Sequence, residues 1–152
     1  MRKRFYPECI YCLYMSYEYT SRIEWTKESE YHGMIETDKG FSSTFDKPSE
    51  FGGKDGTLNP EDAFVASLAM CYSITFKEVC DKMRIDIEEF SLDSVGVIEE
   101  MDTGKAFTKV ILKPRVKTDH KDKSERALRL AKENCLISKS LNIEIIVEPE
   151  IL

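Results

Sequence analysis

The stretch NPEDAFVASLAMCYSITF, residues 59–76, decides the fold. It opens with a strong helix-start signal, because Asn59 is a favourable N-cap residue and Pro60 suits the first helical position. The next two residues are acids, which favour the positive end of the helix dipole. From residue 63 to residue 76 the apolar side chains lie all round the helix rather than on one stripe. We therefore predict a long helix, continuing to about Met83, that is buried on every side by sheets or other helices, possibly from a second chain.

The residues before this helix predict a small antiparallel sheet. Apolar and polar residues alternate with period two over 17–25 and again over 31–37, and the polar residues 27–30 between them suit a turn. Residues 41–45 are expected to add a third strand. Residues 46–58, rich in Gly, Pro and polar residues, predict a loop rather than a domain boundary.

Two long strands are expected after the helix. Residues 94–97 alternate, residues 101–104 form a hairpin-turn signal, and residues 109–117 alternate strictly. Pro114 lies inside this last run and predicts an edge position or the end of the strand.

A helix pair and a final strand close the pattern. Residues 122–133 predict a helix, with Asp122 and Glu125 at the spacing of a capping box. A short helix over residues 135–141 should begin at Cys135 and be capped by Asn134. Residues 143–147 alternate as a strand. The order of elements predicts an α+β fold.

Composition excludes several classes of protein. The 152 residues are 41% apolar, enough for one domain with a real core, and the net charge of −6 argues against a nucleic-acid partner. No apolar run approaches the roughly 20 residues that span a bilayer, so no membrane segment is expected. Residues 1–15 precede the period-two alternation, which begins only at Tyr17. They also lack the apolar stretch and cleavage site of a secretory signal. We treat them as an N-terminal extension of uncertain status, with Met15 as an alternative start, and residues 16–152 as a single domain.

The five cysteines are an odd number and are widely spread, which favours a reducing cytoplasm over a disulfide scaffold. Cys9-x-x-Cys12 has no second pair at metal-site spacing. Cys80 should point away from Cys71, because nine residues leave it half a turn out of phase. The histidines, His32 and His120, have no partners at ligand spacing. The sequence also has no P-loop, Rossmann glycine pattern or HExxH, so neither a metal nor a cofactor is expected.

Two segments resemble the OsmC/Ohr family, which comprises osmotically inducible protein C and the organic hydroperoxide resistance proteins. Residues 56–71, GTLNPEDAFVASLAMC, resemble the family signature NPEELxxAAxAAC. Residues 133–141, ENCLISKSL, resemble its CPVSxxL motif, 64 residues further on. The resemblance covers about residues 17–152. It implies an intertwined homodimer with two long helices at its centre, wrapped by antiparallel sheets.

The resemblance also implies a thiol-dependent peroxidase that acts in the oxidative stress response. Cys71 would attack an organic hydroperoxide and become a sulfenic acid. Cys135 would resolve it as a redox-active disulfide, and a dithiol reductant, a lipoylated protein in some members, would reset the enzyme. Glu61 matches the family's active-site glutamate, which orients an arginine beside the reactive thiol. On one straight helix Glu61 lies about 15 Å from Cys71, so the two cannot share a site in one subunit unless the helix bends. Two such helices packed antiparallel could bring Glu61 of one subunit near Cys71 of the other.

One departure concerns the activating cation. The family's arginine lies in the turn between the first two strands, but here that turn, residues 26–31, contains only Lys27. A lysine lacks the planar fork that can hold a carboxylate and a thiolate together. Either Lys27 substitutes, or Arg22 or Lys54 supplies the charge, or activation is weak. Leu136 replaces the usual proline after the second cysteine.

Two other functions stay open. The protein could be a redox-responsive or small-molecule-binding dimer whose thiol is poorly activated. It could also catalyse a different cysteine-dependent transfer or hydrolysis in the same pocket.

Overall fold

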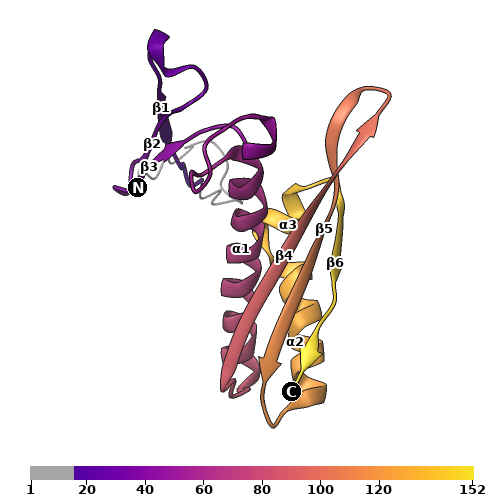
Figure 1. Cartoon of the computed structure of the whole chain (residues 1–152). Coiled ribbons are helices and arrows are strands. Elements are labelled where there is room, and N and C mark those ends of the chain that lie inside the picture. Colours follow the sequence, from indigo (N-terminus) through magenta and orange to yellow (C-terminus); the bar gives the residue numbers. More distant parts are fainter. Residues whose placement is uncertain (1–15) are drawn as a thin grey trace, which may run out of the picture. The chain divides into compact units, whose positions relative to one another are not determined.

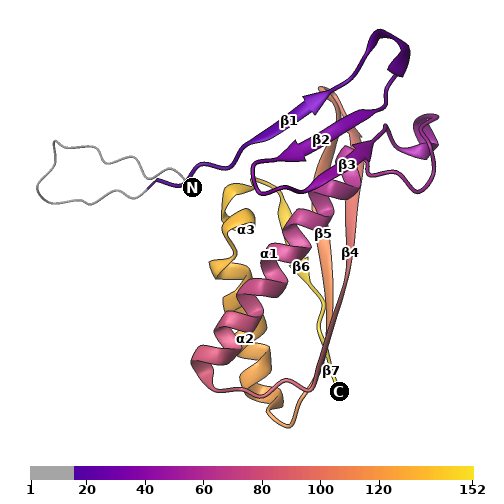
Figure 2. The ribbon, with the colours of Figure 1, turned by 90° about the vertical axis from the view of Figure 1, so that its left-hand side faces the viewer.

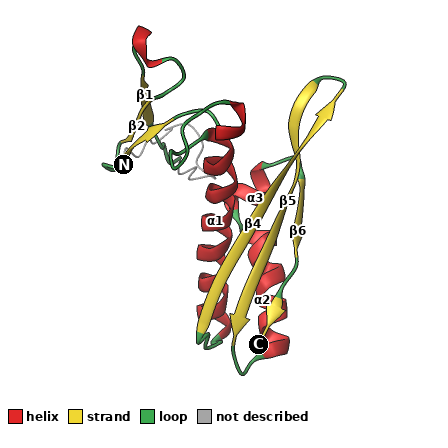
Figure 3. Ribbon diagram, viewed as in Figure 1, coloured by secondary structure: helices red, strands yellow, loops and turns green. Residues whose placement is uncertain are grey.

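The computed structural model describes residues 16–152, which form two compact units, one ending at Pro60 and the other spanning residues 61–152. Figures 1 and 3 show the elements of each unit. The Cys9-x-x-Cys12 pair and the predicted N-terminal extension lie outside the described residues.

The first unit is an antiparallel sheet of β1 (Ser21–Glu24), β2 (Gly33–Thr37) and β3 (Ser42–Phe45), in that order. This confirms the predicted hairpin and third strand. The 3-10 turn Lys27–Ser29 joins β1 to β2, and a second one, Ser49–Phe51, lies in the predicted loop.

The sheet of the first unit buries few of its own side chains. Several large apolar residues on its strands and connecting segments are exposed within the single chain, namely Tyr17, Tyr19, Ile23, Trp25, Tyr31 and Phe41. Trp25 is 70% exposed and Tyr19 82% exposed. Soluble proteins rarely leave so many aromatic side chains in water without a partner.

Helix α1 (Pro60–Met83) has the predicted bounds. It ends because Arg84 adopts a left-handed conformation (φ 52°) and the N–H of Ile85 donates to the carbonyl of Cys80, as at many helix C-termini. By length and hydropathy α1 could also cross a membrane, a property that core helices of soluble proteins share.

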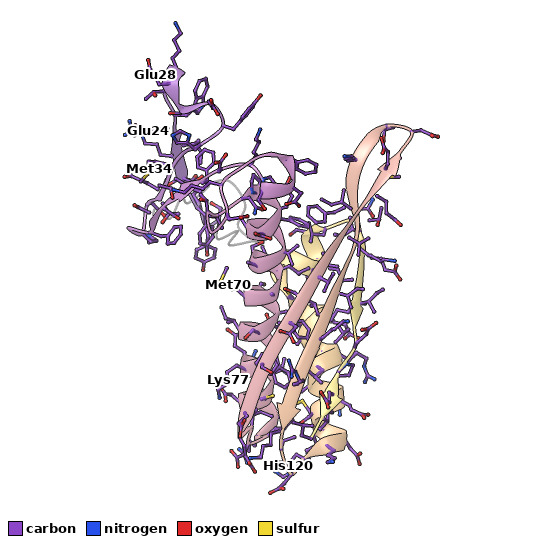
Figure 4. The ribbon with its side chains drawn as sticks, in the orientation of Figure 1. Glu24, Glu28, Met34, Met70, Lys77 and His120 are labelled. Carbon is purple, nitrogen blue, oxygen red and sulfur yellow. The ribbon has the colours of Figure 1, made fainter. Side chains whose placement is uncertain are left out.

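The single chain buries only part of α1, so the predicted burial on every side, which allowed for a second chain, stays a prediction. Leu68, Tyr72 and Phe76 are buried, but Met70 and Ile74 on another face are each 61% exposed. Figure 4 shows Met70 pointing away from the long strands. Because one sheet covers only one side of a helix, the hairpin and α2 leave this face of α1 uncovered within residues 61–152.

The second unit contains the long hairpin of β4 (Glu89–Met101) and β5 (Gly104–Lys117), paired antiparallel. Gly104 has a φ of 108°, which a tight turn requires and which other residues rarely adopt. Two short strands, β6 (Glu144–Val147) and β7 (Glu150–Ile151), pair parallel to β5. The hairpin and β6 were predicted, whereas β7 is too short to leave a period-two signal.

Pro114 is neither at an edge nor at a strand end, so that prediction is wrong. It lies within β5, opposite Leu92 of β4. The carbonyls of Leu112 and Val116, on either side of it, accept hydrogen bonds from Glu148 and Leu152, which come directly after β6 and β7. The missing N–H of Pro114 therefore faces the interruption between these two short strands, where no ladder hydrogen bond is lost.

The helix pair is confirmed as α2 (Lys121–Asn134) and α3 (Leu136–Ser140). The predicted capping box at Asp122 is not formed, because α2 begins one residue earlier with His120 as its N-cap residue. The side chain of Thr118 accepts the N–H of His120 and donates to the carbonyl of Asp86.

Helices α1 and α2 cover the same face of the long hairpin (Figure 2). The core between them combines inward-facing residues of β5, such as Val110 and Leu112, with Leu128 of α2 and Phe76 of α1. The ring of Phe76 stacks on Phe90 of β4, with centroids 5.0 Å apart. This α+β architecture, with its long central helix, confirms the predicted fold class and places the middle of α1 beside the end of α2.

Candidate functional site

Two cysteines from distant parts of the chain meet in this core. Cys71 lies in the middle of α1, and Cys135 lies between α2 and α3. Their sulfur atoms are 2.9 Å apart, although 64 residues separate them in the sequence. The structure therefore brings together the two cysteines that the sequence singled out.

A buried hydrogen bond fixes α1 against α2 next to this contact. The hydroxyl of Tyr72 donates to the carbonyl of Leu128 at 3.1 Å, and Tyr72 is fully buried. Tyr72 comes directly after Cys71, and Leu128 precedes Cys135 by about two helical turns. The hydroxyl thus helps to hold the two sulfur-bearing segments in register. The sequence pattern gave no sign of this role, because a tyrosine in an apolar run reads as core.

Cys135 is the N-cap residue of α3, rather than its first residue capped by Asn134 as predicted. Its backbone is extended, and its Sγ accepts the N–H of Ser138 at 3.5 Å. Asn134 instead ends α2, where its side-chain amide donates to the carbonyl of Leu130. A serine three residues after a cysteine has the spacing of an N-cap contact, and that signal could have predicted the arrangement.

The two sulfurs differ in accessibility. Cys135 is 0% exposed, whereas Cys71 is half-buried and lines a groove of about 530 Å³. The groove runs along one stripe of α1 and is closed by α2 and the start of α3. Its other lining residues are Thr75, Glu78, Val79, Lys82, Met83, Leu130, Asn134 and Leu136. A small molecule in this groove meets Cys71 and not Cys135.

The pKa values of the two thiols are linked. Burial raises the pKa of Cys71, the hydrogen bond to Cys135 adds to this, and the N–H groups of Ile137 and Leu136 oppose it. Burial also raises the pKa of Cys135, but hydrogen bonds to Cys71 and Ser138 outweigh it and leave this pKa lowered. Because the sulfurs share a hydrogen bond, the first proton lost belongs to the pair rather than to either residue.

Glu61, the second residue of α1, has a carboxylate oxygen that forms no hydrogen bond within the described residues. Its Oε2 is buried and has no hydrogen-bond partner among residues 16–152. A buried carboxylate oxygen without a donor is costly. Glu61 lies ten residues before Cys71 on one continuous helix, which places the two residues about 15 Å apart along the helix axis. Within one chain, then, Glu61 and the thiol pair are not in contact.

The candidate cations lie in the first unit. Lys27 is the first residue of the 3-10 turn between β1 and β2, and the sequence predicted a turn at this position. Arg22, on β1, forms a salt bridge with Glu24 at 2.5 Å. The backbone N–H of Lys54 donates to Asp46. Activation of the Cys71 thiol by any of these cations therefore stays a prediction.

The remaining candidate residues are not part of this site. Cys80 belongs to the buried core, and burial raises its pKa to about 11. His32 is exposed, and His120 is partly exposed at the start of α2. Within residues 16–152 no group of three or more His, Cys, Asp or Glu side chains is arranged to hold a metal ion.

The fold and the paired thiols define an α+β protein with a two-cysteine site on its long helix. The family described as OsmC-like protein matches residues 52–150, and the chain belongs to that family. The match spans both cysteines and Glu61.

Individual relatives are distant. The chain is 25% identical over 113 residues to the uncharacterized protein YmaD of Bacillus subtilis, covering 68% of this chain and 75% of YmaD. An OsmC-like protein of unknown function from Vibrio cholerae superposes with a TM-score of 0.81 at 25% identity, covering 88% of this chain and 99% of that one. The organic hydroperoxide resistance protein OhrB of B. subtilis has a TM-score of 0.67 at 20% identity, with coverage of 90% and 98%. An organic hydroperoxide resistance protein OsmC from Legionella pneumophila has a TM-score of 0.72 at 23% identity, with coverage of 89% and 96%.

Proposed function

We propose that this protein is a cytoplasmic thiol-dependent peroxidase that reduces organic hydroperoxides. The observation that carries the proposal is the 2.9 Å contact between Cys71 and Cys135, with only Cys71 facing a groove. Two structural relatives, from L. pneumophila and B. subtilis, are named organic hydroperoxide resistance proteins, which favours this substrate class.

In the first step the Cys71 thiolate attacks the terminal oxygen of the hydroperoxide. An S–O bond forms, the O–O bond breaks, and the organic part leaves as an alkoxide that takes up a proton to become an alcohol. Cys71 is oxidised to a sulfenic acid. The apolar wall of the groove, which includes Val79, Met83 and Leu136, favours organic over hydrogen peroxide because it adds burial of the carbon skeleton.

In the second step Cys135 resolves the sulfenic acid. Its sulfur attacks the sulfur of Cys71, an S–S bond forms, and the hydroxyl leaves as water with the proton of the thiol. The starting distance of 2.9 Å means that no segment has to move far before this bond forms. Rapid resolution protects Cys71 from irreversible oxidation. An external dithiol then returns both cysteines to thiols and is itself oxidised to a disulfide.

A second copy of the chain completes the proposed site. Met70 and Ile74 leave an apolar face of α1 exposed, and the segments that flank and connect the strands of the first unit expose aromatic residues. A homodimer with antiparallel α1 helices would cover the first of these faces. It would also bring Glu61 of one copy near Cys71 of the other, and a cation such as Lys27 could then satisfy the buried Oε2 and stabilise the thiolate.

One observation favours the second candidate function, a redox-responsive or ligand-binding dimer without peroxidase activity. Burial raises the pKa of Cys71, and no cation is among the main contributors that oppose this. If Lys27 fails to reach the thiol, Cys71 stays protonated at neutral pH and reacts slowly.

A peroxidase assay separates the two functions. Consumption of cumene hydroperoxide and hydrogen peroxide is measured with a lipoamide-type dithiol, on the wild type and on Cys71→Ser, Cys135→Ser and Cys80→Ser variants. We expect turnover with the organic hydroperoxide to vanish in Cys71→Ser and to survive in Cys80→Ser. Cys135→Ser should become oxidised beyond the sulfenic acid at Cys71. Full turnover by Cys71→Ser, or none by the wild type, would exclude the peroxidase.

A further inference from the structure

We propose that the dithiol reductant enters through the groove between α1 and α2 and attacks Sγ of Cys71, so that the mixed disulfide forms on Cys71 and Cys135 is expelled. This inference rests on the proposed function, because it describes how the Cys71–Cys135 disulfide is reduced. It assigns the groove to a second reactant and decides which of the two sulfurs that reactant meets.

Accessibility is the first argument. Thiol–disulfide exchange requires a thiolate to reach one sulfur of the disulfide from outside, and its rate depends on access to that sulfur. Cys135 is 0% exposed and is not among the residues that line the groove, whereas Cys71 is one of them. A thiol that arrives through the groove therefore meets Sγ of Cys71 first, with Cys135 positioned as the group that departs.

The leaving group gives the second argument. A thiol of low pKa leaves faster than one of high pKa. Cys135 is the N-cap residue of α3, and its Sγ accepts the N–H of Ser138, a donor that does not depend on Cys71 and can stabilise the departing thiolate. Cys71 lies in the middle of a helix, and burial raises its pKa. Expulsion of Cys135 is therefore favoured over expulsion of Cys71.

The groove that leads to Cys71 is long enough for an extended molecule. From Cys71 to Met83 the groove runs along α1 for twelve residues, about 18 Å. Val79, Met83 and Leu130 supply apolar walls, Glu78 and Lys82 supply charged ones, and Leu136 also lines the groove. A groove of this length and mixed lining admits an extended thiol compound.

The exchange balances as two successive displacements. One thiolate of the reductant forms a bond to Sγ of Cys71, and the Cys71–Cys135 bond breaks with its electron pair on Cys135. The second thiolate of the reductant then attacks the reductant sulfur of this mixed disulfide and releases Cys71 as a thiolate. The reductant closes into a cyclic disulfide, having given two electrons to the cysteine pair and its two protons to the released thiolates or to solvent.

Trapping the first intermediate tests the assignment. The full chain carrying Cys9→Ser, Cys12→Ser and Cys80→Ser is oxidised with diamide, so that disulfide formation does not depend on peroxidase activity. It is mixed with 6-mercaptohexanol and quenched rapidly with N-ethylmaleimide. Trypsin places the two remaining cysteines on separate peptides, because cleavage after Lys54 and Lys77 releases one and cleavage after Lys132 and Lys139 the other.

Mass spectrometry then locates both labels. We expect the mercaptohexanol adduct on Cys71 and the maleimide on Cys135. The opposite distribution overturns the proposal, as does failure of diamide to form the disulfide. A protein that forms the disulfide with diamide and gives the expected labels, yet consumes no hydroperoxide, would refute the peroxidase and leave the assignment of the attacked sulfur intact.

Two matched variants on α3 test the route of entry. Leu136 is 67% exposed and lines the groove beside Cys71. Lys139 is also exposed but lines a different surface groove with Lys132, Ser138 and Ile143. We expect Leu136→Trp to slow reduction of the disulfide by at least about tenfold and Lys139→Trp to leave it unchanged, because only the first substitution narrows the route to Cys71. Slowing by Lys139→Trp alone, or by both equally, overturns the proposal.

Discussion

Oxidation of the cysteine pair should make the protein markedly harder to unfold. A bond between Cys71 and Cys135 closes a loop of 64 residues, which are otherwise free to separate in the unfolded chain. The sulfur atoms are already 2.9 Å apart in the reduced protein, so bonding requires them to approach by only about 0.9 Å. The native state therefore accepts the bond with little rearrangement, and the main effect falls on the unfolded state.

The chain-entropy relation for a loop of this length gives about 4 kcal/mol of added stability at 25 °C. For a chain of this size, that free energy corresponds to a rise in melting temperature on the order of 10 °C. Contacts that the unfolded chain retains across the loop reduce this gain.

Urea unfolding of reduced and diamide-oxidised protein, monitored by circular dichroism at one protein concentration, measures this difference. Equal concentration matters because association stabilises the folded state by mass action. The double variant Cys71→Ser, Cys135→Ser is the control, and its stability should not respond to diamide. If mass spectrometry confirms the Cys71–Cys135 bond but the oxidised protein is no more stable than the reduced one, the two cysteines are not native neighbours and the two-cysteine site is wrong.

Three further outcomes are expected from the same structure. Phe76→Ala should lower the free energy of unfolding, measured with urea, by about 3–5 kcal/mol, because Phe76 is 2% exposed and stacks on Phe90. A loss below about 1 kcal/mol would contradict the place of Phe76 in the core. Met70→Glu should leave a folded chain that sediments as a monomer if α1 of a second copy covers this 61% exposed side chain, and an unchanged dimer would place the interface elsewhere. Burial raises the pKa of Cys80 to about 11, so the folded state keeps a proton that the unfolded thiol has lost. The free energy of unfolding should then fall between about pH 9 and pH 11, by at most about 3 kcal/mol, and the fall should be smaller in Cys80→Ala. Equal pH profiles of the wild type and Cys80→Ala would show that Cys80 ionises freely in the folded state.

Local patterns in the sequence predicted most elements. The helix-start signal at Asn59 led to a helix with nearly the predicted bounds, and the strict alternation over residues 109–117 marked the second part of β5, which begins at Gly104. These signals are strong because capping and period-two burial act within a few residues of the chain. The failures were of a different kind. Pro114 is tolerated inside β5 because its neighbour on one side is interrupted, and no pattern within residues 109–117 carries that information.

The chain order by itself determined which residues could do chemistry: two cysteines, one in an apolar helix and one beside a short helix, together with an acid at the start of the long helix. Tertiary structure alone decided that the two sulfurs touch, that Cys135 caps α3 itself, and that only Cys71 faces a groove. The reason is physical. Residue types and helix periods are set locally, whereas a contact across 64 residues depends on how α1 and α2 share one face of the sheet.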